Sequence, residues 1–498
     1  MKSLWTSPLS RWLTRVSPGL LAISPATQAA VSLPRPANSV QSDESSARFG
    51  FAYDGVLGTS LDAQLDAVTA RDARECQHRI LAEIDRLENI LSPRDPASEF
   101  NRVRAGAPIK SAELADVLAA YDSWSLRTHG ALHANLDEVV ALWKNASRTG
   151  RAPDDAALAA AFAAPRSLAI DALGKAYIVD RAATVAREFA AAGLLNIGGD
   201  LRAWGDRAWM IDVANPFDPA DNAAPLTRIP LCNAAIATSG GYARNFSIGA
   251  QRYSHLIDPR TLRPIAPGRA ATVVAADCVS ANALSTALCV LDASEATPIA
   301  RAFALDFLRV GGTDELGASR GFGAVTPIST AKFADDVGTI PSATGTTWPE
   351  EFQLSVGISL RAGENQGRRV KRPYVAVWVE DAEHHLVRTI TVWGSEGRYL
   401  PDLTKWWRAV GGNRRSAAAV TRATRSPGAY TVAWDGRNDQ GERVPQGDYT
   451  IVVEINREHG HHVWESATVS CAAIAATAEL RDTPESDVSS ITYGPRGG

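Results

Sequence analysis

The hydrophobic pattern divides the chain into a first part with mixed periodicity and a last part with strand periodicity only. Apolar residues at helical spacing predict an amphipathic helix over 62–91 and further helices over 111–126, 154–163, 182–192, 279–291 and 294–304. Alternating or continuous apolar runs predict strands at 49–57, 194–197, 208–213, 234–238 and 270–275. Together they predict an α+β domain, which we place at 48–330.

The pattern changes after this domain. Residues 331–350 lose periodicity and gain Gly, Pro, Ser and Thr, which predicts a linker. Residues 351–473 predict an all-β, Ig-like sandwich, because short alternating runs at 352–360, 373–380, 386–393, 429–434 and 448–456 are separated by turn signals such as Asp435-Gly436. Residues 474–498 show no such pattern and predict a disordered tail.

The first 47 residues form a signal-like segment and linker. Basic Lys2, Arg11 and Arg15 precede the short apolar stretch Gly19–Ile23, and small residues follow. This is the order of a secretory signal, but the apolar core is short, so a signal and a plain extension both stay open. The chain has no run of 18 apolar residues and therefore predicts no transmembrane segment.

Composition narrows the function further. The formal net charge is −4 over 498 residues, which gives no reason to expect a nucleic-acid partner. Five widely spaced cysteines without a CxxC pair favour neither a disulfide framework nor a zinc ribbon. Seven of the 13 tryptophans lie at or beyond Trp348, so the aromatic excess belongs to the last part of the chain.

Two glycine-rich segments follow predicted strands. Asn196–Asp200 reads NIGGD and Ala237–Tyr242 reads ATSGGY. Paired glycines let the backbone approach a ligand closely, and the small hydroxyl residues of the second segment offer N–H and O–H groups to a phosphate. For each segment taken alone, a tight turn is the alternative.

Two further segments carry polar groups suited to catalysis. His255 lies three residues before Asp258, which places a base near a carboxylate for removing a proton from a hydroxyl. Asn282 and Thr286 share one face of a predicted helix with Ser285 beside them, and such oxygens suit a hard cation like Mg²⁺. A structural histidine and a polar patch on a buried helix are the alternatives.

The order of these four segments resembles that of the ApbE-type FAD:protein FMN transferases. The resemblance spans about residues 50–325. It also includes Leu57-Gly58-Thr59, Ser98–Asn101, Gly130–His133, Leu142-Trp143, and Asp171 with Lys175–Asp180.

The resemblance implies magnesium-dependent transfer of FMN from FAD to a Thr or Ser hydroxyl of a partner protein, with release of AMP. It gives His255 and Asp258 catalytic roles. It places the FAD substrate against Leu57, Ala131, Leu132, His133, Asp171, Lys175 and Leu256. It places Mg²⁺ against Asn282, Ser285, Thr286 and a backbone carbonyl near Gly174. The implied partner is an acceptor flavoprotein, a subunit of a bacterial redox complex, on the periplasmic face of the inner membrane; a cytoplasmic location is the alternative.

Three departures from the family pattern surround this site. Asn282 stands where the family has Asp, which removes one negative charge from the metal site. Leu132-His133 replaces Phe-Asp in the FAD pocket, and the segment from Asp171 to Lys175 is about two residues shorter. The alternative function is therefore a flavin-binding protein that holds FAD without transferring FMN.

The last part resembles a domain of unknown function found beside flavin-transfer enzymes, on the stretches Pro373–Asp381 and Trp434-Asp435-Gly436. Within it, Ala418–Thr424 resembles a flavin acceptor motif and makes Thr424 a candidate self-acceptor; a polar surface loop is the alternative. The pair Trp406-Trp407 cannot point inward together from one strand, which predicts one exposed tryptophan as a docking surface for a redox partner.

Overall fold

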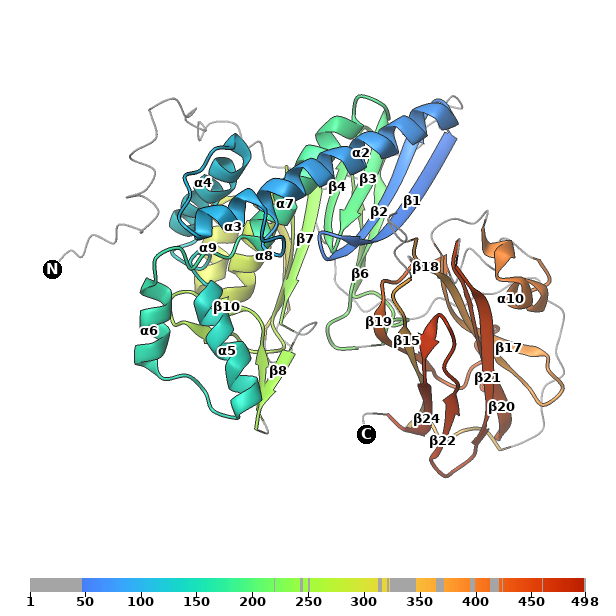
Figure 1. Ribbon diagram of the computed structural model, residues 1–498. Coiled ribbons are helices and arrows are strands. Elements are labelled where there is room, and N and C mark those ends of the chain that lie inside the picture. Colours follow the sequence, from blue (N-terminus) through green and yellow to red (C-terminus); the bar gives the residue numbers. More distant parts are fainter. Residues whose placement is uncertain are drawn as a thin grey trace. The chain divides into compact units, whose positions relative to one another are not determined.

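The computed structural model (Figure 1) describes residues 47–218, 220–241, 245–249, 251–311, 316–319, 322, 346–363, 371–394, 399–412, 421–422, 424–458 and 460–496. The signal-like segment and most of the predicted linker lie outside them. The described residues fall into two compact units. The first takes in 63–216 and 228–325, and the second takes in 50–62, 217–227 and the chain from 326 onward.

One eight-stranded sheet runs through the first part of the chain, in the order β1-β2-β3-β4-β7-β12-β13-β14. Its strands are β1 (Ala47–Val56), β2 (Thr59–Ala67), β3 (Ala192–Ile197), β4 (Asp200–Trp204), β7 (Ala235–Gly240), β12 (Ala270–Ala275), β13 (Asp306–Val310) and β14 (Leu316–Ala318). Short pairs are formed by β5 (Trp209–Val213) with β6 (Thr227–Leu231), β8 (Asn245–Ile248) with β9 (Gln251–Ser254), and β10 (Ile257–Asp258) with β11 (Arg263–Pro264). The helices are α2 (Ala70–Leu91), α3 (Glu99–Arg104), α4 (Ala112–Arg127), α5 (Asp137–Thr149), α6 (Asp155–Ala163), α7 (Asp171–Ala186), α8 (Cys278–Val290) and α9 (Ala293–Ala302).

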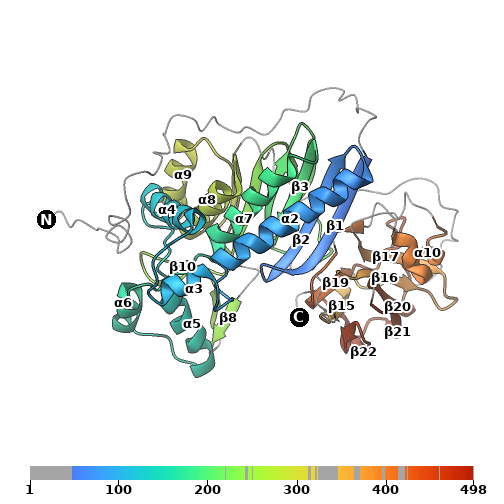
Figure 2. The same cartoon turned by 45° about the horizontal axis from the view of Figure 1, so that its top comes forward.

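Helix α2 starts later than the pattern predicted. Residues 62–67, expected in the helix, belong to strand β2. The helix begins after Thr69, whose side chain accepts a hydrogen bond from the Asp72 backbone N–H at 3.1 Å. From there Ile80, Ile84 and Leu87 form the buried stripe of an amphipathic helix. Figure 2 shows α2 lying lengthwise beside the strands, with α7 next to it.

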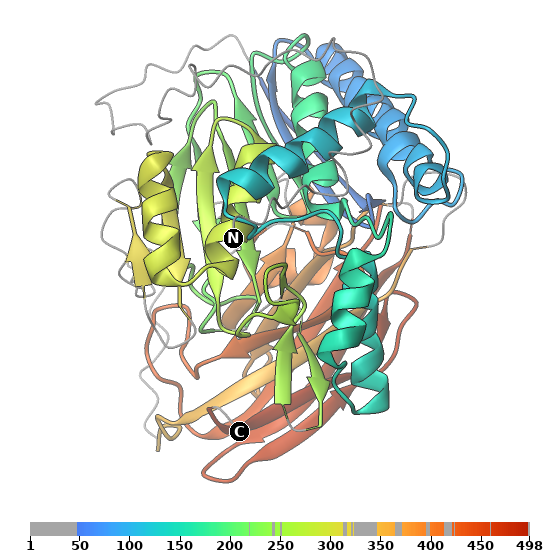
Figure 3. The same ribbon diagram turned by 90° about the vertical axis from the view of Figure 1, so that its left-hand side faces the viewer.

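Helices α7 and α8 pack against the sheet and contain polar residues of the predicted site. Helix α8 is buried almost throughout and is capped by Asp277, which precedes it and whose side chain accepts from the Ser280 backbone N–H at 2.7 Å. A smaller cluster forms where α5 and α6 meet the β8–β9 hairpin, through Trp143, Leu158 and Ile257. Figure 3 shows this helix pair in teal beside the hairpin in yellow-green.

The second unit contains a sandwich of two five-stranded sheets. The first sheet runs β19-β15-β24-β22, with β23 paired to β15, and the second runs β18-β17-β16-β20-β21. The strands are β15 (Phe352–Leu360), β16 (Tyr374–Glu380), β17 (Leu386–Trp393), β18 (Thr421–Arg422), β19 (Gly428–Trp434), β20 (Gly447–Asn456), β21 (His462–Cys471), β22 (Ala476–Leu480), β23 (Ser486–Asp487) and β24 (Ser489–Pro495).

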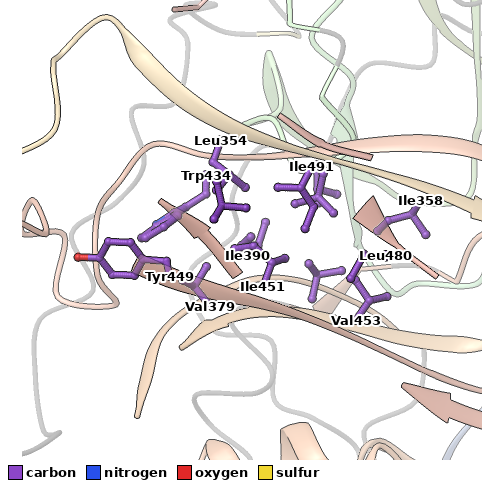
Figure 4. Close-up of a cluster of buried hydrophobic side chains, with 14 of the residues drawn as sticks. Leu354, Ile358, Val379, Ile390, Trp434, Tyr449, Ile451, Val453, Leu480 and Ile491 are labelled. Atoms are coloured by element: carbon purple, nitrogen blue, oxygen red, sulfur yellow. The ribbon is translucent and has the colours of Figure 1, made fainter. Parts of the chain in front are cut away.

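Both sheets contribute side chains to one core. Leu354 and Ile491 come from the first sheet, Ile451 and Val453 come from the second, and Figure 4 shows them pointing toward one another. The predicted α+β region followed by an all-β region is therefore confirmed. The Ig-like connectivity stays a prediction.

The predicted disordered tail is wrong. Residues 474–498 contain β22, β23 and β24, and β24 lies inside its sheet between β15 and β22. Ile491 and Tyr493 on β24 are fully buried. The short alternation of these strands was too weak to recognise without their partner β15, which lies more than 130 residues earlier.

The tryptophan pair does not lie on a strand. Trp406 and Trp407 belong to the short helix α10 (Thr404–Ala409), which follows a 3₁₀ turn at Leu400–Asp402. Trp406 is fully buried and Trp407 packs against the same cluster. The exposed tryptophan of this unit is Trp464, with Lys405 Nζ 3.5 Å from its ring centre. Among the described residues, no helix has the length and apolar character to cross a membrane.

Candidate active site

Asn282, Asp200 and Lys175 lie together near the start of α8. Asn282 on α8 donates from Nδ2 to Oδ1 of Asp200 at 2.9 Å, and Asp200 is the first residue of β4. Lys175 on α7 places Nζ 3.1 Å from Asp200 Oδ2 and 3.0 Å from the carbonyl oxygen of Gly198. The segment NIGGD and the helical Asn282 therefore lie side by side.

Burial sets the electrostatics of this group. Asp200 is 3% exposed and Asn282 is 8% exposed. Burial raises the pKa of Asp200, and the Lys175 charge and the Asn282 hydrogen bond oppose that shift. Within the described part of the chain, Oδ1 of Asn282 is buried and has no hydrogen-bond partner. An amide oxygen in this condition is a ready ligand for a cation.

Hydroxyl groups continue the polar strip one turn further along α8. Ser239 at the end of β7 lies 3.0 Å from Oγ of Ser285 and 3.0 Å from Oγ1 of Thr286. Ser285 is fully buried and also lies 3.1 Å from the Asn282 carbonyl oxygen. Its bonds are therefore taken up within the protein, whereas Thr286 is half-buried and better placed for a ligand.

The segment from Asp171 to Lys175 is helical rather than a loop. Helix α7 begins at Asp171, which is exposed in its first turn, and Gly174 is buried inside the helix. Carbonyl groups inside a helix accept the N–H four residues later. The Gly174 carbonyl is consequently less available to a metal than the sequence suggested.

Asp180 joins α7 to α8. Its carboxylate accepts the backbone N–H groups of Cys278 at 2.9 Å and Val279 at 3.1 Å, the first two residues of α8. These N–H groups have no partner within a helix, and a carboxylate there also meets the positive end of the helix dipole. Burial raises the Asp180 pKa to about 6, although both hydrogen bonds act to lower it.

His255 and Asp258, the predicted catalytic pair, differ in their exposure to solvent. His255 is exposed, whereas Asp258 is 8% exposed. Oδ1 of Asp258 accepts the backbone N–H of Arg260 at 2.9 Å and its Nε at 3.0 Å, and Oδ2 accepts Nη2 at 2.8 Å. The guanidinium of Arg260 thus offsets the charge that Asp258 would lend to the histidine. Leu256, which follows His255, is half-buried, and its backbone N–H donates to Ser254 Oγ at 3.1 Å.

Arg260 also borders the predicted flavin-binding stretch. A Cβ added to Gly130 would lie 3.5 Å from Cγ of Arg260. Ala131 and Leu132 that follow are 1% and 5% exposed, so their side chains belong to the core. His133 is half-buried: its Nδ1 accepts the Asn135 N–H at 2.9 Å, its ring lies 5.1 Å from Phe162, and burial lowers its pKa.

Two predicted residues belong to the second unit. Leu57 stands at the β1–β2 turn with φ 53°, followed by Gly58 with φ 70°. Two positive φ angles in succession define a type I′ hairpin turn, where leucine is unusual. Thr424 is 2% exposed, and its Oγ1 is buried. Most of the acceptor-like segment before it lies outside the described residues.

Asp200 and Asp180 were noted inside sequence motifs without a role, and Ser239 was expected only among the hydroxyl residues that could face a phosphate. In NIGGD and ATSGGY the paired glycines drew the interpretation, and the polar residue beside each pair makes the contact to α8. The sequence signal for Asp200 was a carboxylate directly after two glycines, at the start of a strand. Among the described residues no three His, Cys, Asp or Glu side chains form a group that could hold a metal ion, so a metal site here would need amide or hydroxyl oxygens besides a carboxylate.

Part of the chain is similar to known FAD:protein FMN transferases. A FAD:protein FMN transferase of Haemophilus influenzae is 27% identical over 271 residues, covering 48% of this chain and 78% of that protein. The FAD:protein FMN transferase of Salmonella typhimurium is 26% identical over 285 residues, covering 49% and 79%. One of Rhodobacter capsulatus is 37% identical over 100 residues, or 20% of this chain and 18% of that protein.

Solved structures and family models were also compared. The apo flavinyl transferase ApbE of Pseudomonas stutzeri aligns with a TM-score of 0.47 at 21% identity, covering 57% of this chain and 98% of that one. The ApbE protein of Thermotoga maritima aligns with a TM-score of 0.48 at 24% identity, covering 56% and 99%. Residues 355–489 match the family described as "Predicted periplasmic protein (DUF2271)". Residues 57–308, half of the chain, match the ApbE family model, and the protein therefore belongs to the ApbE family.

Proposed function

We propose that this protein transfers FMN from FAD to a Thr or Ser hydroxyl of an acceptor protein, with release of AMP and with Mg²⁺ bound at the start of α8. The observation that carries the proposal is the buried contact between Asp200 and Asn282, which leaves Asn282 Oδ1 without a partner among the described residues. The names of the relatives support flavin transfer to proteins. The description of the DUF2271 family supports a periplasmic site of action.

The residues at the start of α8 fit a hard cation. They offer the Asn282 amide oxygen, the half-buried Thr286 hydroxyl and the nearby Asp200 carboxylate, and oxygen ligands of these types suit Mg²⁺. Among the described residues, Asp200 is the carboxylate that contacts Asn282, and Lys175 is paired with it. We therefore expect weaker Mg²⁺ binding than at a site with two carboxylates. When bound, the ion supplies Lewis-acid neutralisation of phosphate charge.

The proposed step breaks one P–O bond and forms another. The acceptor hydroxyl oxygen attacks the FMN phosphorus of FAD, the bond from that phosphorus to the bridging oxygen breaks, and AMP leaves with that oxygen. His255 accepts the hydroxyl proton, because it is exposed and can meet a protein substrate. Arg260, fixed by Asp258 and by Glu295 at 2.6 Å, adds positive charge near the Gly130 segment.

The test is intact-mass analysis after incubation with FAD, Mg²⁺ and a peptide of the acceptor pattern Asp-x-x-Thr-Gly-Ala-Thr. We expect one FMN per peptide and AMP in equal amount. His255→Ala should lower the transfer rate at least 100-fold and leave FAD binding intact, since general base catalysis typically contributes about 10²–10⁴-fold. FAD binding without AMP release by the wild type would instead identify a flavin-holding protein.

Two controls separate the alternatives. His385→Ala changes an exposed histidine of the second unit and should leave transfer unchanged. Thr424→Ala tests self-modification: FMN on the wild-type chain that disappears in this variant would make Thr424 an acceptor. Because Thr424 is buried, we expect modification of the peptide rather than of the chain.

A further inference from the structure

The contact between Asp200 and Asn282 has a defined direction. A carboxylate only accepts hydrogen bonds, so the atom of Asn282 that faces Asp200 at 2.9 Å is the amide nitrogen. The amide oxygen must then point to the other side. There it is buried and lacks a hydrogen-bond partner among the residues that the structure describes. Asp200 thus decides which end of the amide is free.

Asp200 is itself fixed from a second direction. Lys175 Nζ lies 3.1 Å from Oδ2, and the same ammonium group donates to the Gly198 carbonyl oxygen at 3.0 Å. The carboxylate is 3% exposed, so water does not compete for these contacts. The two oxygens of Asp200 therefore have different partners: Oδ2 pairs with Lys175, and Oδ1 accepts the hydrogen bond from Asn282.

We propose that Asp200 is a positioning residue for the cation site: it orients the Asn282 carbonyl oxygen toward the ion and supplies the negative charge that residue 282 lacks. The proposal rests on the proposed function, and it adds a role for a residue on β4 to a site otherwise built on α8. It explains why the buried Asn282 amide oxygen has no partner among the described residues, a condition that is unfavourable unless a ligand completes it.

The same geometry predicts that the carboxylate can change places. An aspartate at 282 beside Asp200 would bring two buried carboxylates into contact, which disfavours ionisation of both. Exchanging the two residues, as Asp200→Asn with Asn282→Asp, keeps one carboxylate and one amide and reverses the hydrogen bond. The exchange moves the charge from β4 to α8 without changing the number of charges or the size of either side chain.

The test is calorimetric titration of Mg²⁺ into the full chain, with and without FAD, for the wild type, Asp200→Asn, and the double exchange. We expect Asp200→Asn to weaken Mg²⁺ binding at least roughly tenfold, the effect typical of removing a group that orients a metal ligand. The double exchange should recover most of that loss. Asp212→Asn, an exposed aspartate paired with Arg228, is the matched control and should bind as the wild type does.

Three results would overturn the proposal: no Mg²⁺ binding by the wild type, equal affinity of Asp200→Asn and the wild type, or a double exchange that binds no better than Asp200→Asn. Thermal unfolding of each variant distinguishes a purely structural role, because that role lowers stability without a recovery of Mg²⁺ affinity in the exchange. The titration is independent of FMN transfer, so a wild type that binds Mg²⁺ in this pattern but releases no AMP contradicts only the proposed function.

Discussion

Asp180 supplies one carboxylate to the backbone of a neighbouring helix. Because burial raises its pKa to about 6, the folded protein holds a proton that the unfolded chain, with a pKa near 3.8, has released. Between these values the folded state binds more protons than the unfolded state. This group's contribution to stability is therefore full below pH 3.8, falls as pH rises, and is lost above pH 6.

We expect Asp180→Asn to cost more stability at pH 4.5 than at pH 7. At pH 4.5 the wild type still has the benefit of proton uptake, whereas at pH 7 it bears a buried charge that the variant lacks. Urea unfolding midpoints of both proteins at the two pH values provide the measurement. The exposed Asp218→Asn is the control, and a difference between wild type and Asp180→Asn that does not change with pH would contradict the prediction.

The sequence alone predicted some residues of the candidate site and missed others. Asn282, Ser285 and Thr286 were expected together because helical spacing alone puts them on one strip, and α8 keeps them there. Asp200 and Ser239 come from β4 and β7, which approach α8 only through the sheet order. Helical periodicity is local, whereas the pairing of distant strands is not, so spacing alone predicted only the part of the site that lies on one helix.

Helix α10 is capped by a residue from another element. It has no side-chain cap of its own, since Leu403 precedes it. Glu454 on β20 is fully buried and accepts the backbone N–H groups of Lys405 at 3.0 Å and Trp406 at 2.8 Å, and His462 Nε2 lies 2.7 Å from the same carboxylate. These N–H groups would otherwise lack partners, so the carboxylate holds the start of the helix.

We expect Glu454→Gln to destabilise the second unit by about 1.5–3 kcal/mol, the range for hydrogen bonds to a charged group. The start of α10 should loosen, and Trp406, now fully buried, should become accessible to water. Urea unfolding and the tryptophan emission maximum measure the two effects. Glu479→Gln, on an exposed position of β22, should change neither; equal stability of Glu454→Gln and the wild type would show that the cap is dispensable.

Elements were predicted well where period and burial agree. Strand β15 was expected at 352–360, because one of its faces meets the core and the other does not. Strand β17 was expected at 386–393, and its last five residues are buried on both faces. Residues 62–67 were assigned to the helix since Leu65 fits either period, and only Thr69 marks the true start. For α10, the Trp406-Trp407 pair suggested a strand although its cap lies in Glu454, almost 50 residues away.

The second unit also includes residues far from the predicted linker. Residues 50–62 and 217–227 belong to it, although both lie in the stretch expected to be the first domain. Asp221 N–H donates to the Thr431 carbonyl at 2.8 Å, and the Asn222 side chain bonds the N–H and C=O of Ala433. Strand β19 is at the edge of its sheet, so these contacts satisfy backbone groups that would otherwise be open. A single boundary along the sequence therefore cannot separate the two units.

Arg372 concentrates the buried charge of this unit. It is almost fully buried, with Nη2 2.7 Å from Asp62 Oδ2 and Nε 3.3 Å from Asp54 Oδ1. It also donates to the carbonyl oxygens of Leu61 at 2.8 Å and Thr424 at 2.7 Å. Burial raises the pKa of Asp54 to about 6 and raises that of Asp62, even though Arg372 opposes both shifts.

We expect Arg372→Met to destabilise the protein by about 3–5 kcal/mol at pH 7, because it removes the nearest cation from the buried Asp54 and the half-buried Asp62. Without Arg372 both pKa values should rise further, so the loss should shrink as the pH falls and the carboxylates take up protons. Arg437→Ala, whose guanidinium is 41% exposed beside Asp435, should cost under about 1 kcal/mol. A pH-independent cost for Arg372→Met would contradict this account of Asp54 and Asp62.

Strand β24 makes the end of the chain part of the second unit's core. Its Ile491 and Tyr493 are fully buried, and it pairs with β15 on one side and β22 on the other. Truncation after residue 473 would remove β24 together with β22, and would leave β15 paired with β19 on one side and with an open edge on the other. We therefore expect the truncated chain to lose the cooperative unfolding transition of this unit and to aggregate, whereas a chain ending at Arg496 should unfold as the full chain does. Calorimetric scans of the three chains, at equal concentration, measure this. A truncated chain that keeps the unfolding transition of this unit would show that strands β15 to β21 hold the sandwich without β22, β23 and β24.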